Sequence, residues 1–349
     1  MPKRLLLLVA LVAVAWTSTA FVSAGGSGFA WHPTPTGSAA RLRGVSAVSA
    51  DVAWTSGSLG TVLRTVDRGA TWQRVGPPGT ANLQFRDIEA FDADHAVILS
   101  IGELSDSRIY VTSDGGHTWT LTFVNAEPEA FYDCMTFFDK ERGLALSDPV
   151  NGKFRIIATD DGGLSWHFAG ADMPPALPGE FAFAASGQCL VTDHGHTAWF
   201  GTGGAAAFAR VFRSDDRGET WQVNTTPIVG GPSGGIFALA FRGQQHGLAV
   251  GGDFLSPAFS PDALASTSDS GRSWQLVAAA PNEYRSGAAW VTGTAAVVVG
   301  PTGSDVSVDQ GQTWQRFDSG SLDTVDCAHN GACWASGALG RAAHLVTTR

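Results

Sequence analysis

The sequence predicts an all-β fold built from repeated four-stranded sheets, and three observations support this prediction. An octapeptide, (Ser/Thr)-x-Asp-x-Gly-x-(Ser/Thr)-Trp, occurs six times along the chain. Gly and Trp account for 43 and 12 of the 349 residues, as expected of tight turns and of cores between sheets. No window sustains the apolar periodicity of an amphipathic helix over three turns, which disfavours a parallel α/β fold.

The octapeptide sets the period of the repeat, because its Asp recurs at intervals of 40 to 55 residues. Self-similarity at such a period indicates a solenoid or a propeller. We expect each Asp to accept hydrogen bonds from backbone N–H groups one or two residues further on, and each Trp to cover the turn. The expected structural residues are Asp67, Trp72, Asp114, Trp119, Asp161, Trp166, Asp216, Trp221, Asp269, Trp274, Asp309 and Trp314.

The segments between the octapeptides repeat as well. "FRDIEAFDADHAVILSIG" from Phe85 and "FYDCMTFFDKERGLALSD" from Phe131 each read as strand, turn and strand. A third strand then leads into the octapeptide, whose Trp begins a fourth. Four strands in about 45 residues correspond to one blade of a β-propeller.

The repeats predict seven blades, although only six carry the octapeptide. The repeat from Leu322 ends after three strands, and Phe29–His32 resembles the strand that follows each octapeptide. We therefore expect the N-terminal strand to complete the last blade and close the ring. The predicted organisation is a signal peptide at 1–24 and one propeller at 25–349, with blades near 41–80, 81–127, 128–176, 177–231, 232–281, 282–319 and 320–349 plus 28–35.

The N-terminus has the pattern of a secretory signal peptide. Lys3 and Arg4 precede the apolar run Leu5–Trp16, and Val22–Ala24 is a small-residue cleavage site. We expect a secreted or periplasmic protein without a membrane span after cleavage; an uncleaved anchor is the alternative. The formal net charge is −10, which argues against nucleic acid as a partner, because phosphate contacts need a basic surface.

Export permits disulfides, and the chain has four cysteines. Cys327 and Cys333 flank a short turn and are expected to pair across it. Cys134 and Cys189 occupy equivalent columns of neighbouring blades, where they either form a disulfide or remain two buried thiols. CxxC spacing is absent and His329 stands alone between two cysteines, so no metal site is predicted.

The octapeptide resembles the Asp box of BNR-type propellers, which occurs in sialidases, sortilin-like receptors and photosystem II assembly factors. The repeat "GTVLRTVDRGATWQRV" at 60–75 is similar to the Ycf48/HCF136 photosystem II assembly factor family, and the likeness covers about residues 28–349. This resemblance implies an exported seven-bladed propeller that holds partner proteins without catalysis. We find no RIP-like arginine motif of sialidases and no dinucleotide, flavin or haem motif, so no cofactor is expected.

Blade geometry places the starts of the first strands and the loops between second and third strands on one face, opposite the octapeptides. We expect a binding site at this channel mouth for a protein or peptide, with a glycan as the alternative partner and with the protein acting as a monomer. The alternatives are a solvated funnel of paired charges and a sialidase-like or other glycoside hydrolase that uses Asp87, Asp133 or Asp148. The candidate mouth residues are Arg43, Arg86, Asp87, Tyr132, Asp133, Asp148, Lys153, Arg155, Gln188, Asp253, Arg285 and Asp323.

Overall fold

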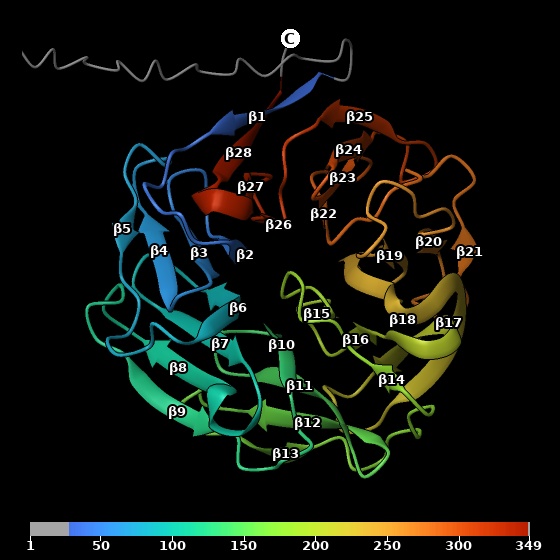
Figure 1. The fold of residues 1–349 in the computed structure, drawn as a ribbon, viewed down its shortest axis with the longest axis horizontal. Helices are drawn as coiled ribbons and strands as arrows, with labels where there is room; N and C mark the ends of the chain where they lie inside the picture. The colour runs from blue at the N-terminus through green and yellow to red at the C-terminus, as the bar shows by residue number, and fades with distance from the viewer. Residues whose placement is uncertain (1–27, 348–349) are drawn as a thin grey trace, which may run out of the picture.

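The computed structural model describes residues 28–347, which form a ring of β-sheets around a central axis (Figure 1). The predicted signal peptide lies outside the described residues. The all-β prediction is confirmed: the helical elements of this range are two 3-10 turns, Leu104–Asp106 and Ala338–Gly340. No helix within it is long and apolar enough to cross a membrane.

Four sheets each consist of four consecutive antiparallel strands, with the first strand nearest the axis (Figure 1). The first three contain β2 (Leu42–Ala47), β3 (Ala53–Gly57), β4 (Thr61–Thr65) and β5 (Gln73–Arg74); β6 (Gln84–Ala90), β7 (Ala96–Ile101), β8 (Arg108–Thr112) and β9 (Thr120–Val124); and β10 (Tyr132–Phe137), β11 (Gly143–Val150), β12 (Lys153–Thr159) and β13 (His167–Ala169). The fourth contains β22 (Gly287–Trp290), β23 (Ala296–Gly300), β24 (Gly303–Ser307) and β25 (Gln315–Asp318).

A larger sheet of eight strands lies between the third and fourth of these. It contains β14 (Glu180–Phe181), β15 (Leu190–Thr192), β16 (Ala198–Gly201), β17 (Gly203–Ser214), β18 (Gln222–Arg242), β19 (His246–Asp253), β20 (Leu264–Thr267) and β21 (Gln275–Leu276). β18 runs for 21 residues because the glycine-rich stretch in its middle stays extended and pairs with β17 on one side and β19 on the other. The sequence-based boundary at 231/232 therefore falls inside a continuous strand.

The N-terminal strand closes the ring. β1 (Phe29–Pro33) pairs antiparallel with β28 (Ala342–Thr347), which continues through β27 (Cys333–Ser336) to β26 (Thr324–Cys327). Trp31 of β1 also donates from Nε1 to Ser304 Oγ of β24 at 3.0 Å, so the strand contacts the neighbouring sheet. This is the pairing that the sequence predicted, and it leaves neither end of the ring as an open sheet edge.

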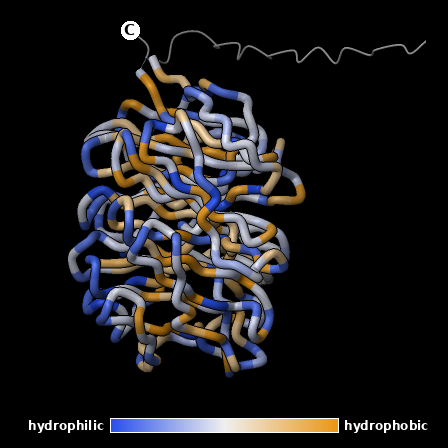
Figure 2. The backbone as a smooth tube through the Cα atoms, turned by 90° about the vertical axis from the view of Figure 1, so that its left-hand side faces the viewer, coloured by the Kyte–Doolittle hydropathy of each residue, from blue (hydrophilic) through white to orange (hydrophobic). Residues whose placement is uncertain are grey.

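The hydrophobic core lies at the interfaces between successive sheets. Trp54 of β3, for example, is fully buried and packs edge-on against Trp119 of the next sheet, with ring centres 6.5 Å apart. Figure 2 shows hydrophobic strands in the interior of the molecule and hydrophilic turns around its periphery. Each sheet is therefore stabilised mainly by its neighbours, as burial of apolar surface requires.

The octapeptides form turns with one repeated hydrogen-bond pattern. Thr112 Oγ1 donates to Asp114 Oδ1 at 2.9 Å and accepts from the N–H of Gly116 at 3.0 Å, while Asp114 accepts from the N–H and hydroxyl of Thr118 at 2.8 and 2.6 Å. The donor N–H lies four residues beyond the Asp, not one or two as expected, because the left-handed Gly116 (φ +82°) turns the chain back. Equivalent contacts recur in the other five copies.

The octapeptide Trp directly precedes the fourth strand instead of beginning it. In the last four copies its indole N–H donates to the carbonyl of the octapeptide Gly at 2.9–3.2 Å. Trp119 donates instead to the carbonyl of Val75, in the preceding sheet, at 2.6 Å. The Trp therefore stabilises both the turn and the contact between sheets.

Candidate binding site at the channel mouth

β-Bulges at the starts of the inner strands build the channel mouth. In β2, β6 and β10 the pairing register skips one residue, which is Arg43, Arg86 and Asp133, respectively. The equivalent bulge in β18 skips Phe237. A bulge leaves one residue unpaired and re-aims its side chain, and bulges are frequent beside functional sites. Four equivalent bulges thus present two arginines, one aspartate and one phenylalanine around the axis.

The two arginines of the mouth form no close ion pair, although both interact electrostatically with Asp323 and Arg86 also interacts with Asp133. Both arginines are half-buried. The Arg43 side chain makes no hydrogen bond or ion pair with the rest of residues 28–347, whereas Arg86 donates from Nη1 to the carbonyl of Ala184 at 2.5 Å. Burial, together with the charges of Arg43 and Arg41, lowers the pKa of Arg86 to about 10, so it remains a cation at neutral pH. Burial likewise lowers the pKa of Arg43. Two adjacent, incompletely compensated cations favour an anionic ligand.

A third arginine, which sequence reasoning missed, neutralises the predicted residue Asp323. Arg41 donates to both carboxylate oxygens of Asp323, at 2.8 and 2.6 Å, and the Asp323 side chain is only 3% exposed. The pairing is bidentate, so Asp323 is engaged by Arg41 and leaves Arg43 unpaired. Asp323 is therefore part of the wall of the mouth and not a free carboxylate for a ligand.

The Asp133 carboxyl lies close enough to Asp148 and Arg86 to interact electrostatically with both. Burial and the charge of Asp148 raise the pKa of Asp133 well above its ordinary value, and its Oδ2 is buried without a hydrogen-bond partner among the described residues. Burial raises the pKa of Asp148 to about 6, although Oδ1 accepts from the N–H of Ala182 at 2.9 Å. Burial therefore disfavours the charged form of Asp133, which weakens its compensation of the neighbouring Arg86.

Asp87, another predicted mouth residue, is a buried link between two sheets. Its Oδ1 accepts from the N–H of Ile88 at 2.8 Å and its Oδ2 from the N–H of Met135, in β10, at 2.6 Å. Burial raises its pKa to about 8. Both oxygens are used by the backbone, so the Asp87 carboxyl is a structural acceptor.

An aromatic cluster forms another wall of the mouth. Phe183 stacks on Phe237 at 3.9 Å between ring centres, and Tyr284 packs edge-on against Phe237 at 4.7 Å. Phe254 contacts the same cluster and is 44% exposed. Tyr284 also interacts electrostatically with Arg43, which places the aromatic and arginine walls next to each other. The mouth therefore combines positive charge with apolar surface.

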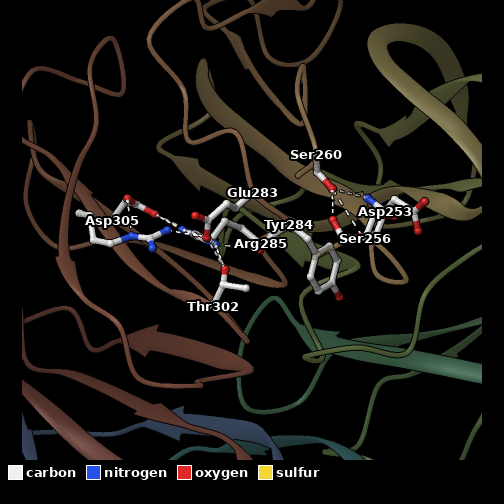
Figure 3. A network of polar contacts seen from close by, with 9 residues as sticks. Asp253, Ser256, Ser260, Glu283, Tyr284, Arg285, Thr302 and Asp305 are labelled. Carbon is white, nitrogen blue, oxygen red and sulfur yellow. Dashed lines mark hydrogen bonds and ion pairs between the residues drawn. The ribbon is translucent and has the colours of Figure 1, made fainter. Parts of the chain in front are cut away.

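Arg285 was predicted to reach a ligand, and the structure corrects this prediction (Figure 3). Its side chain is 2% exposed, with Nε and Nη2 donating to Asp305 at 2.8 and 2.5 Å. Nη1 donates to Thr302 at 2.9 Å and lies 3.3 Å from Glu283, which also binds Arg316 at 2.5 Å. Its donors are used in this buried network, which joins β24 to the segment before β22.

Gln188 was expected to line the mouth of an open channel. In the structure it bridges sheets across the ring and closes the channel. Its Nε2 donates to the carbonyls of Ala288 and Val325, at 2.7 and 2.9 Å, on two sheets across the ring. The hydroxyl of Thr324 donates to the carbonyl of Ser186 at 3.1 Å, and Gly187 packs directly against Asp87. The segment 184–188 thus forms the floor of the mouth.

The four remaining candidates are not brought together at the mouth. Tyr132 is buried against Phe123, and burial raises its pKa. Arg155 pairs with Glu127 at 2.9 and 3.0 Å. Lys153 is exposed beside the β11–β12 turn. Asp253 accepts from the N–H of Leu255 at 2.8 Å within its own loop, where Ser260 also accepts from the Asp253 N–H at 3.0 Å (Figure 3).

The predicted disulfide Cys327–Cys333 is present, and Cys134 and Cys189, for which two alternatives were open, also form a disulfide. Cys327 and Cys333 are cross-strand partners with Cα atoms 4.0 Å apart. Cys134 and Cys189 are bonded with Cα atoms 6.1 Å apart, so the alternative of two buried thiols is wrong. The second disulfide directly follows Asp133 and Gln188 in the chain and therefore fixes the floor of the mouth to β10. Among residues 28–347, no three His, Cys, Asp or Glu side chains gather as metal ligands.

Solved structures resemble this one, whereas no protein-family model and no curated protein matches the chain. YCF48 bound to D1 peptide has a TM-score of 0.64 at 14% identity, covering 91% of this chain and 95% of the other. YCF48 from Cyanidioschyzon merolae has a TM-score of 0.65 at 16% identity, covering 90% and 98%. The fold is a β-propeller similar to YCF48. The likeness predicted from the octapeptides is thus confirmed at the level of fold.

A propeller enzyme also has a similar fold. The GH74 xyloglucanase from Xanthomonas campestris has a TM-score of 0.62 at 14% identity, and the match covers 90% of this chain but only 53% of the enzyme. At such identities a likeness shows the fold alone, so the function must be argued from the mouth itself.

Proposed function

We propose that the protein is an exported, monomeric, non-catalytic scaffold that binds a protein or peptide through the arginine side of its channel mouth. In this proposal the ring has seven blades, with the eight-stranded sheet counted as two blades that share the continuous strand β18. The octapeptide turns are Asp boxes that hold the opposite face, and the signal peptide directs the chain out of the cytoplasm.

The observation that carries the proposal is the pair Arg43 and Arg86, displayed by equivalent bulges without a close ion pair. The chain is acidic overall, with a net charge of −10, so two half-buried cations without a close ion pair attract an anion locally. The adjacent Phe254, which is 44% exposed and packs on the buried Phe237, adds apolar surface. A peptide with acidic and apolar side chains has the matching chemistry, and YCF48, a structural neighbour, is bound to a peptide.

The glycoside hydrolase alternative has less support. Asp87 is committed to two backbone N–H groups, and Asp133 is 2% exposed. Only Asp148 of the three candidate carboxylates is half-buried instead of buried. Hydrolysis of a glycosidic bond usually needs two carboxyl groups that both reach the substrate, so this mouth is better suited to binding than to hydrolysis.

Binding of labelled decapeptides tests the proposal. We expect a Glu/Phe-rich peptide to bind, with fluorescence anisotropy rising on titration, and a Lys/Phe-rich peptide of equal length not to bind. Arg43→Gln with Arg86→Gln should weaken binding at least tenfold, because each lost charge-assisted contact contributes about 1.5–3 kcal/mol. Arg272→Gln, an exposed arginine in an octapeptide turn, is the matched control. Equal binding by the double variant would contradict the site.

A further inference from the structure

Two histidines meet at the end of the channel opposite the arginine mouth. His194 lies in the turn between β15 and β16, and His329 lies in the turn between β26 and β27. The inner strands β15 and β26 begin on the side of the mouth and run away from it, so both turns lie beyond the floor formed by 184–188. The two imidazole rings have centres 5.3 Å apart and planes inclined by 76°.

Both turns are held rigidly by local contacts. Asp193 Oδ1 accepts from the N–H groups of Gly195 and Thr197, at 2.8 and 3.0 Å, and so supports His194 in a left-handed conformation (φ +59°). The turn of His329 is closed by the disulfide between Cys327 and Cys333. Side chains displayed from fixed turns lose little conformational entropy when they bind a common ligand.

The surroundings of the pair suit a cation. Asp326 interacts electrostatically with both imidazoles, while its own oxygens accept from the N–H groups of Ala47 and Cys327 at 2.7 and 2.8 Å. Burial and the neighbouring His329 lower the pKa of His194, which favours the neutral imidazole. The His194 ring also interacts with the backbone of Phe137, the kind of neighbour that orients metal-bound histidines.

We propose that His194 and His329 bind one divalent transition-metal ion, such as Zn²⁺, with water completing its coordination shell. Two imidazoles bound tetrahedrally to one Zn²⁺ at about 2.1 Å would have ring centres about 5 Å apart, which is close to the distance in the structure. Imidazole nitrogens suit Zn²⁺, Ni²⁺ and Cu²⁺. The ion would join the sheet of β15 to the sheet of β26 across the ring. This inference does not depend on the arginine mouth.

Isothermal titration calorimetry with ZnCl₂ tests the proposal. The full mature chain is first treated with a chelator and dialysed to remove bound metal. We expect one bound ion and a rise in the unfolding temperature with Zn²⁺, because a ligand that binds only the folded state stabilises it. His194→Ala and His329→Ala should each lower the affinity at least tenfold and remove the rise. Circular dichroism in chelator should show that both variants are folded.

The control is His32→Ala, which removes another close pair, since the rings of His32 and His344 are 4.8 Å apart on β1 and β28. It should leave Zn²⁺ binding unchanged. Loss of binding in His32→Ala with normal binding in His194→Ala would overturn the assignment, as would an absence of any Zn²⁺ binding by the unmodified chain. Binding should also weaken as pH falls below about 6.5, because protonated imidazole has no lone pair for a metal.

Discussion

Gln188 and Ala288 exchange two hydrogen bonds across the centre of the ring, with Nε2 donating to the Ala288 carbonyl at 2.7 Å and the Ala288 N–H donating to Oε1 at 3.0 Å. The Gln188 amide thereby pairs like a short piece of β-strand with β22. This contact divides the channel into an arginine mouth on one side and a histidine turn pair on the other. The mouth is consequently a recess with a floor and not an open tunnel.

Replacement of Gln188 by Ala should destabilise the protein. It removes three hydrogen bonds and leaves backbone groups of Ala288 and Val325 without their partners. At about 1 kcal/mol for each bond, we expect the free energy of unfolding to fall by about 2–4 kcal/mol in urea titrations. Gln222→Ala, at an exposed position of β18, should change it by less than about 0.5 kcal/mol. A similar loss in both variants would contradict the role of the Gln188 amide.

Removal of Arg285 should mainly lower stability, whereas removal of Arg43 should mainly weaken peptide binding. Arg285→Ala removes the close ion pair of the buried Asp305 and leaves it only the more distant Arg316, at 3.8 Å, and breaking such a buried pair typically costs about 3–5 kcal/mol. Arg43→Ala removes a side chain without an ion-pair partner, and we expect less than about 1 kcal/mol of lost stability together with weaker peptide binding. Urea unfolding and anisotropy, measured on both variants, separate the two effects. A stable Arg285→Ala protein with impaired binding would restore the sequence-based assignment.

The octapeptide turns should lose the stabilisation by their Asp carboxylates only in strong acid. The hydroxyl and N–H of Thr118 hold the pKa of Asp114 at about 2, below the value of about 3.9 in an unfolded chain. Since the folded-state pKa is lowered, the stabilisation is present above pH 4 and is lost as pH falls toward 2. Asp114→Asn should therefore be less stable than the unmodified chain at pH 5, and the difference should shrink by pH 2. A difference independent of pH would contradict this mechanism.

The two disulfides should contribute unequally to stability. Loop-closure entropy predicts about 4 kcal/mol for Cys134–Cys189, with a sequence separation of 55, and about 2 kcal/mol for Cys327–Cys333, with a separation of 6. Paired Cys→Ala variants, compared by urea unfolding, measure both values. The larger loss should come from the pair that fixes the floor of the mouth. The reverse order would show that strain, not loop length, controls the result.

The regular part of the fold was predictable from the sequence because the octapeptide encodes its own turn. Its Asp, Gly and hydroxyl residues satisfy one another locally, so six copies place six turns without knowledge of distant contacts. The continuous β18 was not predictable, since glycines that normally end a strand remain extended there through pairing on both sides.

The candidate site was predicted only in outline. The inner-strand columns located Arg43, Arg86 and Asp133, but the bulges that expose them arise from pairing between strands. Arg285 was misassigned because its partner Asp305 belongs to another strand. The contact of His194 with His329 had no sequence signal, since their turns belong to separate sheets. Closure of the ring brings these side-chain partners together from distant parts of the chain. Local sequence patterns therefore do not reveal them.

Hydrogen exchange with and without the Glu/Phe-rich peptide tests most directly whether the arginine mouth is the binding face. Mass spectrometry of the exchanged protein locates protected backbone amides by segment. We predict slower exchange at 41–45, 84–88 and 182–188 in the bound state, with the octapeptide turns unchanged. Protection confined to the octapeptide turns, or peptide binding without any protection at these three segments, would contradict the account.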